Sequence, residues 1–229
     1  GALQSTTGTG VFTSESLIPN TLANFGGMGG LGSTPPDPNG DIGPNHYVQM
    51  VNSRFQIFTR AGVSVYGPSN INTLFANFGG PCQLENAGDP VILYDQFADR
   101  WLLSQFTDGT GPFFNCVAIS TTGDPTGTYY RYAFETPAFP DYPKYGIWPT
   151  AYFLNTRENG GGVLGNIALD RAAMIAGNAN AQMVRFTVVQ GGSGPNGLLP
   201  ADVDGFGLPA VGTPGFFVGT SDNDIGAAA

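Results

Sequence analysis

The chain has 229 residues and a formal charge of −9 at pH 7, from 17 acidic and 8 basic residues. Nucleic-acid binding depends on clustered cations that displace counterions from phosphates, and the eight bases here are scattered, so this class of partner is excluded. No apolar run approaches the roughly 18 residues that a spanning helix needs, so we expect no membrane span.

The residue types favour β-structure over helix. Lysine occurs once, at Lys144, so the chain cannot form the Glu/Lys pairs that commonly stabilise long surface helices. Glycine and proline are abundant, at 35 and 18 residues, while 41% of the chain is hydrophobic. The composition therefore predicts a folded, loop-rich, all-β protein.

Residues 1–34 are rich in Gly, Ser and Thr, and the run at 26–30 resembles a flexible tether. We expect an extended arm over 1–34. From residue 35 to residue 229 the chain changes to short runs of β-formers bounded by Gly, Pro, Asn or Asp, which predicts a domain of short strands.

A first candidate site opens this domain. Asp37, Asn39 and Asp41 place three oxygen-bearing side chains at alternate positions beside Gly40, and such a loop suits calcium. The EF-hand pattern is not met, because Val48 stands where that loop requires glutamate. The alternative is a turn in which these side chains bond to their own backbone.

His46 is the only histidine, which excludes a zinc site made of several histidines. One interpretation makes His46, beside Tyr47, the general base of a polysaccharide lyase. The other interpretation is a strand-entry residue held by backbone hydrogen bonds.

Cys82 and Cys116 are the only cysteines and are 34 positions apart. We predict that they form a disulfide in an oxidising compartment, and hence a secreted or cell-surface protein. The alternative is two unpaired thiols in the core.

Aromatic residues gather farther along. Tyr142, Tyr145 and Trp148 form a candidate ligand-binding set, because flat rings beside polar loops suit sugar stacking. Packing in the core is the alternative. Residues 167–177 then show helical spacing, which predicts one or two helical turns, followed by a strand over 183–190.

Four segments resemble one another, each a turn followed by an aromatic residue and an apolar strand. The aromatic residues are Tyr47, Trp101, Tyr152 and Phe216, with spacings of 54, 51 and 64 positions. This spacing, with three or four antiparallel strands per unit, predicts about four blades of a β-propeller. A β-sandwich is the alternative. Four blades are few for a closed ring, so we expect an incomplete propeller or a fragment of a longer chain.

The phrases at 36–47, 88–95, 139–149 and 199–205 resemble those of secreted bacterial proteins with a sialidase-like β-propeller, over residues 35 to 222. The resemblance implies architecture and export and transfers no catalytic residue. Arg100, Arg131 and Arg157 match a sialidase only in number, since the Ser-x-Asp-x-Gly-x-Thr-Trp repeats are missing.

Together these observations favour a secreted module that presents loops to a polysaccharide or a cell-surface protein, or a self-assembling subunit that adds a strand to a neighbour. The alternative function is an extracellular polysaccharide-cleaving enzyme, either a glycoside hydrolase or a lyase.

Overall fold

The computed structural model describes residues 22–30, 32–189, 197–205 and 207–219. In these ranges the regular structure is mainly antiparallel β-strand with a few short helices, which confirms the all-β prediction. None of the helices found there has the length and apolar character needed to cross a membrane.

The strands form four sheets, each a meander in which consecutive strands pair. Sheet A contains β1 (Asn39–Ile42), β2 (His46–Val51), β3 (Arg54–Thr59) and β4 (Ser64–Asn70). Sheet B contains β5 (Gly88–Asp95), β6 (Arg100–Phe106), β7 (Phe113–Ser120) and β8 (Tyr129–Thr136). Sheet C contains β9 (Asp141–Trp148), β10 (Ala151–Glu158), β11 (Val163–Leu169) and β12 (Met183–Val189). Sheet D pairs β13 (Leu199–Pro200) with β14 (Phe217–Val218).

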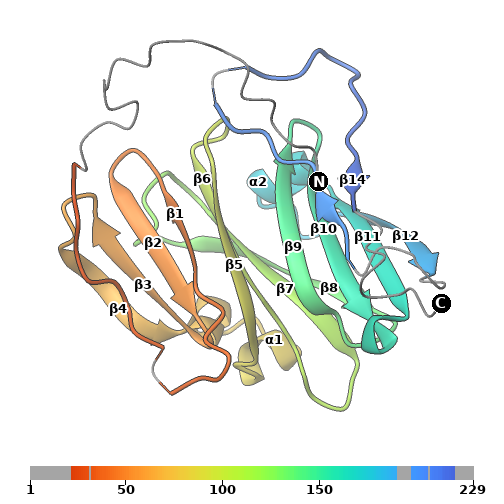
Figure 1. Cartoon of the computed structure of the whole chain (residues 1–229), viewed down its shortest axis with the longest axis horizontal. Coiled ribbons are helices and arrows are strands. Elements are labelled where there is room, and N and C mark those ends of the chain that lie inside the picture. The colour runs from red at the N-terminus through yellow and green to blue at the C-terminus, as the bar shows by residue number, and fades with distance from the viewer. Residues whose placement is uncertain (1–21, 31, 190–196, 206, 220–229) are drawn as a thin grey trace, which may run out of the picture.

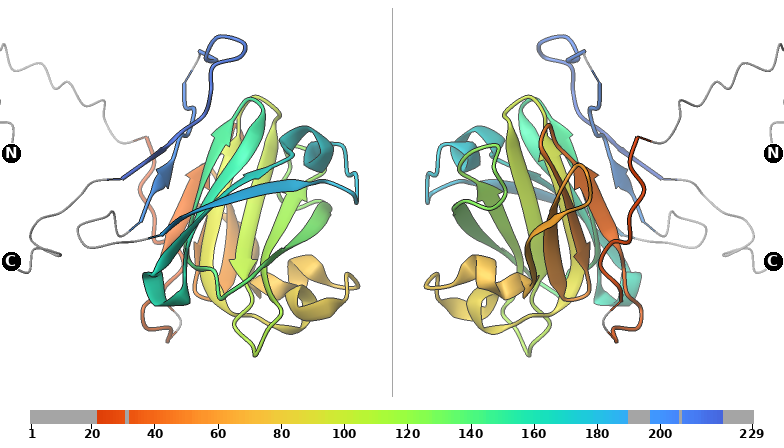
Figure 2. Two further views of the ribbon diagram at one scale, coloured as in Figure 1. Left: turned by 90° about the vertical axis from the view of Figure 1, so that its right-hand side faces the viewer. Right: turned by 90° about the vertical axis from the view of Figure 1, so that its left-hand side faces the viewer.

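Short helices fill the connections between strands. They are η1 (Ile71–Phe75), α1 (Gly80–Leu84), η2 (Asn159–Gly161) and α2 (Arg171–Ile175). Figure 2 shows α1 and α2 on one side of the molecule, and β13, β14 and residues 22–30 on the other.

The first strands of successive sheets are neighbours: β1 lies beside β5, β5 beside β9, and β9 beside β13. Figure 1 shows the sheets following one another from β4 at one side to β12 at the other. The described residues thus form four sheets rather than the two of a sandwich.

Sheet B is buried on both faces. Trp101 and Leu103 of β6 pack in the core shared with sheet A, beside Met50 and Phe55. Leu102, between them in the sequence, packs in the core shared with sheet C. Because successive side chains of a strand point to opposite faces, the unbroken apolar run of β6 serves both cores.

The aromatic-led segments occupy similar places. Tyr47, Trp101 and Tyr152 lie in the second strands of sheets A, B and C, namely β2, β6 and β10. Phe216 comes directly before β14, the second strand of sheet D. The predicted segments are therefore the second strands of four consecutive sheets.

The helical prediction for 167–177 is correct only at Arg171–Ile175, since 167–169 end strand β11. Ile167 and Leu169 alternate into the core, so burial at a period of two decides the structure there. Asp170 then caps α2 by accepting a hydrogen bond from the Ala173 amide (3.0 Å). The strand predicted at 183–190 is β12, and residue 190 lies outside the described residues.

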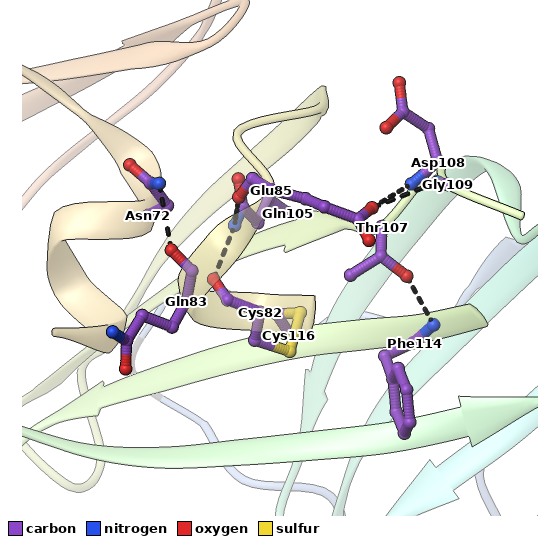
Figure 3. The surroundings of a disulfide bond; sticks show 10 residues. All are labelled: Asn72, Cys82, Gln83, Glu85, Gln105, Thr107, Asp108, Gly109, Phe114 and Cys116. Atoms are coloured by element: carbon purple, nitrogen blue, oxygen red, sulfur yellow. Dashed lines mark hydrogen bonds between the residues drawn. A yellow bond between two sulfur atoms is a disulfide. The ribbon is translucent and has the colours of Figure 1, made fainter. Parts of the chain in front are cut away.

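The predicted disulfide is confirmed. Cys82 of α1 and Cys116 of β7 are bonded, with their Cα atoms 5.7 Å apart. Figure 3 shows Gln105 beside this bond, with Nε2 donating hydrogen bonds to the carbonyl oxygens of Cys82 (3.2 Å) and Glu85 (3.0 Å). The disulfide and this amide fasten α1 to the face of sheet B.

Of the predicted arm, residues 1–21 and 31 lie outside the described residues. Residues 22–30 run without regular structure against sheet A. Phe25 packs against two aromatic rings of sheet A. Its ring centroid lies 6.0 Å from that of Tyr47 and 5.6 Å from that of Phe58. Met28 is buried, and its amide donates a hydrogen bond to Gln49 Oε1 (2.7 Å). This part of the arm therefore belongs to the folded domain.

Candidate functional site

The first strands of sheets A, B and C begin alike. Pro38, Pro90 and Pro143 follow Asp37, Asp89 and Tyr142, and these three preceding residues have positive φ angles of 39°, 42° and 55°. Positive φ is uncommon for residues other than glycine. The same unusual backbone geometry therefore recurs where each first strand enters its sheet.

Side chains tie these strand starts together. Asn52 Nδ2 donates a hydrogen bond to Asp37 Oδ2 (2.6 Å), and Asn52 Oδ1 accepts one from the Asp89 amide (2.8 Å). Asn52 thus links the beginnings of β1 and β5, and the Tyr142 backbone at the beginning of β9 lies close enough to the Asp89 carboxyl to lower its pKa.

A cavity of about 380 Å³ opens between these strand starts. We call it the first-strand cavity; its polar and aromatic lining residues are Asp37, Asn39, Asp89, Tyr142, Lys144 and Tyr145. Two residues of the predicted metal set and two of the predicted ligand-binding set therefore share one cavity.

Charges of both signs meet in this cavity. Lys144 Nζ lies 3.9 Å from the centroid of the Tyr142 ring, and Arg157 Cζ lies 5.8 Å from it. Burial lowers the pKa of the Lys144 amine, although Asp89, Asp37 and Asp141 act in the opposite direction. Burial raises the pKa of Asp89, and the charges of Asp37 and Asp141 raise it further.

Tyrosines give the cavity one exposed and one buried ring. Tyr142 is 52% exposed, so much of its side chain faces solvent. Tyr145 is 8% exposed, and its burial raises the pKa of its hydroxyl. Tyr142 is therefore the aromatic surface that a ligand would meet.

Trp148 lies outside the first-strand cavity. It is buried against Phe153 and Phe216, and its Nε1 donates a hydrogen bond to the Thr213 carbonyl oxygen (3.2 Å). Trp148 thus packs between sheets C and D, as the core-packing alternative expected.

The residues predicted to bind calcium face the next sheet. Asn39 Oδ1 accepts a hydrogen bond from the Ile92 amide (2.6 Å), and Asp41 Oδ2 accepts one from the Tyr94 amide (2.6 Å). Asp41 Oδ1 also accepts from its neighbour's amide, that of Ile42 (2.7 Å). Alternation along β1 puts these side chains on one face, where they join sheet A to sheet B.

Calcium binding stays a prediction. No group of three or more His, Cys, Asp or Glu able to hold a metal occurs in the described ranges.

His46 and Tyr47 are not brought together. His46 lines a cavity of about 630 Å³ with Tyr94, Asp99 and Asp124. Tyr47 lines a different cavity, with residues 22–25 of the arm. Neighbouring residues of a strand point to opposite faces, so a paired action of His46 and Tyr47 has no geometric support.

The sequence pattern did not mark Lys144 as a site residue, and it offered Asp89 only as a weak candidate for a carboxylate pair or an oxygen cluster. The sequence does hold a signal for this site, because a proline occurs near the beginning of each first strand, at 38, 90 and 143. Aligning those prolines places 37, 89 and 142 at equivalent positions and marks 144 as a neighbour. Comparison of the chain with family models, with curated proteins and with solved structures found no match.

Proposed function

We propose that this chain is an extracellular module of β-propeller type that binds a glycan in the first-strand cavity. The observation that carries the proposal is the joining of a half-exposed ring, Tyr142, to the carboxylates of Asp37 and Asp89 in one cavity. Sugar rings present an apolar face and several hydroxyls, which suit an aromatic ring and hydrogen-bond acceptors respectively.

The propeller arrangement is supported by the order of the sheets. Sheets A, B and C are consecutive four-stranded meanders, and the first strand of each lies beside the first strand of the next. Blades of a propeller have this order, with the first strand nearest the axis. In that arrangement the first-strand cavity lies at one end of the axis, where its loops are open to a ligand.

An extracellular location is supported by the disulfide between Cys82 and Cys116, since such bonds persist in oxidising compartments. The resemblance of four phrases to secreted propeller proteins points the same way. Detection of the protein outside the cell, with the disulfide intact in material protected from oxidation during isolation, would test this part.

The binding test uses a panel of immobilised neutral and acidic oligosaccharides. The wild-type protein is expected to bind one class, and Tyr142→Ala to weaken that binding by roughly tenfold, on the order of 1.4 kcal/mol. Tyr66→Ala is the matched control, because Tyr66 is a 41% exposed tyrosine outside the cavity. Equal binding by wild type and Tyr142→Ala would refute the assignment of the site.

The same panel tests the enzyme alternative. Release of reducing or unsaturated ends from a bound polysaccharide would replace the binding proposal by a cleaving enzyme. His46→Ala then decides whether His46 takes part, because products unchanged in that variant remove the lyase model built on this residue.

A further inference from the structure

We propose that two copies of this chain associate through β12, the last strand of sheet C, which pairs antiparallel with the β12 strand of the second copy. In the described part of the chain, sheet C runs from β9 through β10 and β11 to β12, so one edge of β12 has no strand beside it. The proposal concerns self-association and not glycan contacts, so it goes beyond the proposed function and is tested separately.

The edge of β12 lacks the features that protect the last strands of sheets A and B. Proteins commonly protect a strand edge with proline, bulges or charged side chains, because its backbone N–H and C=O groups can pair with another chain. β4 contains Pro68 and pairs with β3 through register shifts, and β8 carries Arg131 and Glu135. β12 contains no proline and pairs with β11 in unbroken register. Its only charged residue, Arg185, forms an ion pair with Glu158 of its own sheet. The edge of β12 is therefore open to pairing.

β12 also exposes an apolar strip toward sheet D. Val184, Phe186 and Val188 lie at alternate positions, so they share one face of the strand, and all three are exposed. The corresponding face of β8 in sheet B carries Tyr132 and Phe134, which are buried in the core shared with sheet C. Sheet C has four strands to cover that face, whereas sheet D has two in the described residues. The strip on β12 is thus an apolar surface that lacks the cover its counterpart has.

This strip continues an interface that is already packed. The Phe186 ring contacts that of Phe217 in β14, with centroids 5.9 Å apart, and Phe217 packs with Trp148 and Phe153 between sheets C and D. Figure 1 shows β12 at the end of the series of sheets, on the side away from β4. A strand added at this edge would therefore extend the apolar layer that lies between sheets C and D.

The residue pattern of β12 indicates that the added strand is a second β12. With a two-fold axis at the central residue of the strand, antiparallel pairing puts Phe186 opposite Phe186 and Val184 opposite Val188. The same register puts Arg185 opposite Thr187, so no like charges face each other. Aromatic and β-branched pairs across strands stabilise a sheet, whereas like charges directly opposite destabilise it. The strand is thus chemically complementary to itself about Phe186.

Sedimentation of the full chain at rising concentration tests the association. Each copy has a formal charge of −9, so the measurement is made at about 0.15 M salt, where charges farther apart than about 8 Å are largely screened. We expect the wild type to approach twice the mass of one chain. Val188→Lys puts an unpaired charge into the interface and is expected to raise the dissociation constant at least roughly tenfold.

Val65→Lys is the matched control for Val188→Lys, because Val65 lies on the edge strand β4 and is 46% exposed, against 40% for Val188. This control should associate like the wild type. A wild type that stays a single chain at every concentration overturns the proposal, and so does equal association of the two lysine variants. Circular dichroism checks that both variants fold, and if Val188→Lys does not fold, the cysteine variants described next decide.

Single cysteines test the register. Cys82 and Cys116 are bonded to each other and are the only cysteines, so an added cysteine supplies the one free thiol. Under mild oxidation Phe186→Cys should give a disulfide-linked pair of chains, because position 186 faces itself across the two-fold axis. Val184→Cys should stay unlinked, because it faces Val188 of the second copy. Equal crosslinking of both cysteine variants, or of neither, overturns the proposal, whether or not the protein binds glycans.

Discussion

Arg171 donates two hydrogen bonds to the Asp95 carboxylate, from Nε to Oδ2 (2.6 Å) and from Nη2 to Oδ1 (2.9 Å). Asp95 ends β5 of sheet B, and Arg171 begins α2 after the third strand of sheet C. The Tyr152 hydroxyl adds a third hydrogen bond to Asp95 Oδ2 (2.8 Å). Asp95 is completely buried, so this cluster joins two sheets through a charge that has no access to water.

Loss of the arginine should therefore be costly. Arg171→Met leaves the Asp95 carboxylate buried without its cation, and we expect the free energy of unfolding to fall by about 3 to 5 kcal/mol. Urea unfolding followed by tryptophan fluorescence measures this loss. Arg54→Met is the control, because Arg54 is exposed, and it should change stability by less than about 0.5 kcal/mol. If Arg171→Met lowers the free energy of unfolding by less than about 1 kcal/mol, the Arg171–Asp95 ion pair does not hold the two sheets together.

The disulfide should contribute by restricting the unfolded chain. Replacing Cys82 and Cys116 together by serine opens a loop with a sequence separation of 34 residues. In the chain-entropy model such a loop contributes roughly 4 kcal/mol. We expect the double variant to lose about that much in urea unfolding, while reducing agent changes the wild type and leaves the variant unaffected. Equal stability of variant and oxidised wild type would be the contrary result.

The sequence predicted the strands better than their assembly. Runs of β-formers such as those around Trp101 and Tyr152 are governed by local preference and burial, and both residues lie in strands. Helices η1 and α1 were not predicted, because five residues are too few to show a helical period and α1 also contains Gly80 and Pro81. Two cysteines allow one pairing, so the disulfide needed only the assumption of an oxidising compartment.

Side-chain roles at the site depended on contacts between sheets. Asp37, Asn39 and Asp41 have the residue types of a metal loop, yet the oxygens of Asn39 and Asp41 accept backbone hydrogen bonds from β5, which is distant in the sequence. The sequence does not distinguish the roles of Trp148 and Tyr145, which are both aromatic residues of one short segment. In the structure Trp148 packs against sheet D, whereas Tyr145 lines the first-strand cavity. Such distinctions follow from which sheet covers which face, and periodicity along one strand does not specify this.

Asn39 offers a direct test of the bridging role. Asn39→Ala leaves the amide of Ile92, a residue that is 1% exposed, without its acceptor, so we expect a loss of about 1 to 3 kcal/mol in the free energy of unfolding. The loss should be the same in calcium and in chelator, because the bond involves no metal. A loss that appears only in calcium, together with a lower melting temperature of the wild type in chelator, would instead support the calcium site.

Stability should rise as the pH falls below the raised pKa values of three carboxyl groups and toward their ordinary value of 3.8, because these groups bind protons more tightly in the folded protein. Burial raises the pKa of Asp41, Asp89 and Asp202, and their acidic neighbours raise it further. A carboxyl whose pKa is higher in the folded state than its ordinary value of 3.8 binds protons more tightly when folded, so acidification between those two values stabilises the fold. Asp124 acts oppositely, since the Thr126 amide lowers its pKa, but the stability that Asp124 contributes is lost only below pH 3.8.

Melting temperatures at constant ionic strength measure the effect. Asp204→Asn should weaken it, because Asp204 raises the pKa of both Asp41 and Asp202. A melting temperature that falls steadily as the pH is lowered all the way to 3.8 would show that these carboxyls do not govern the pH dependence.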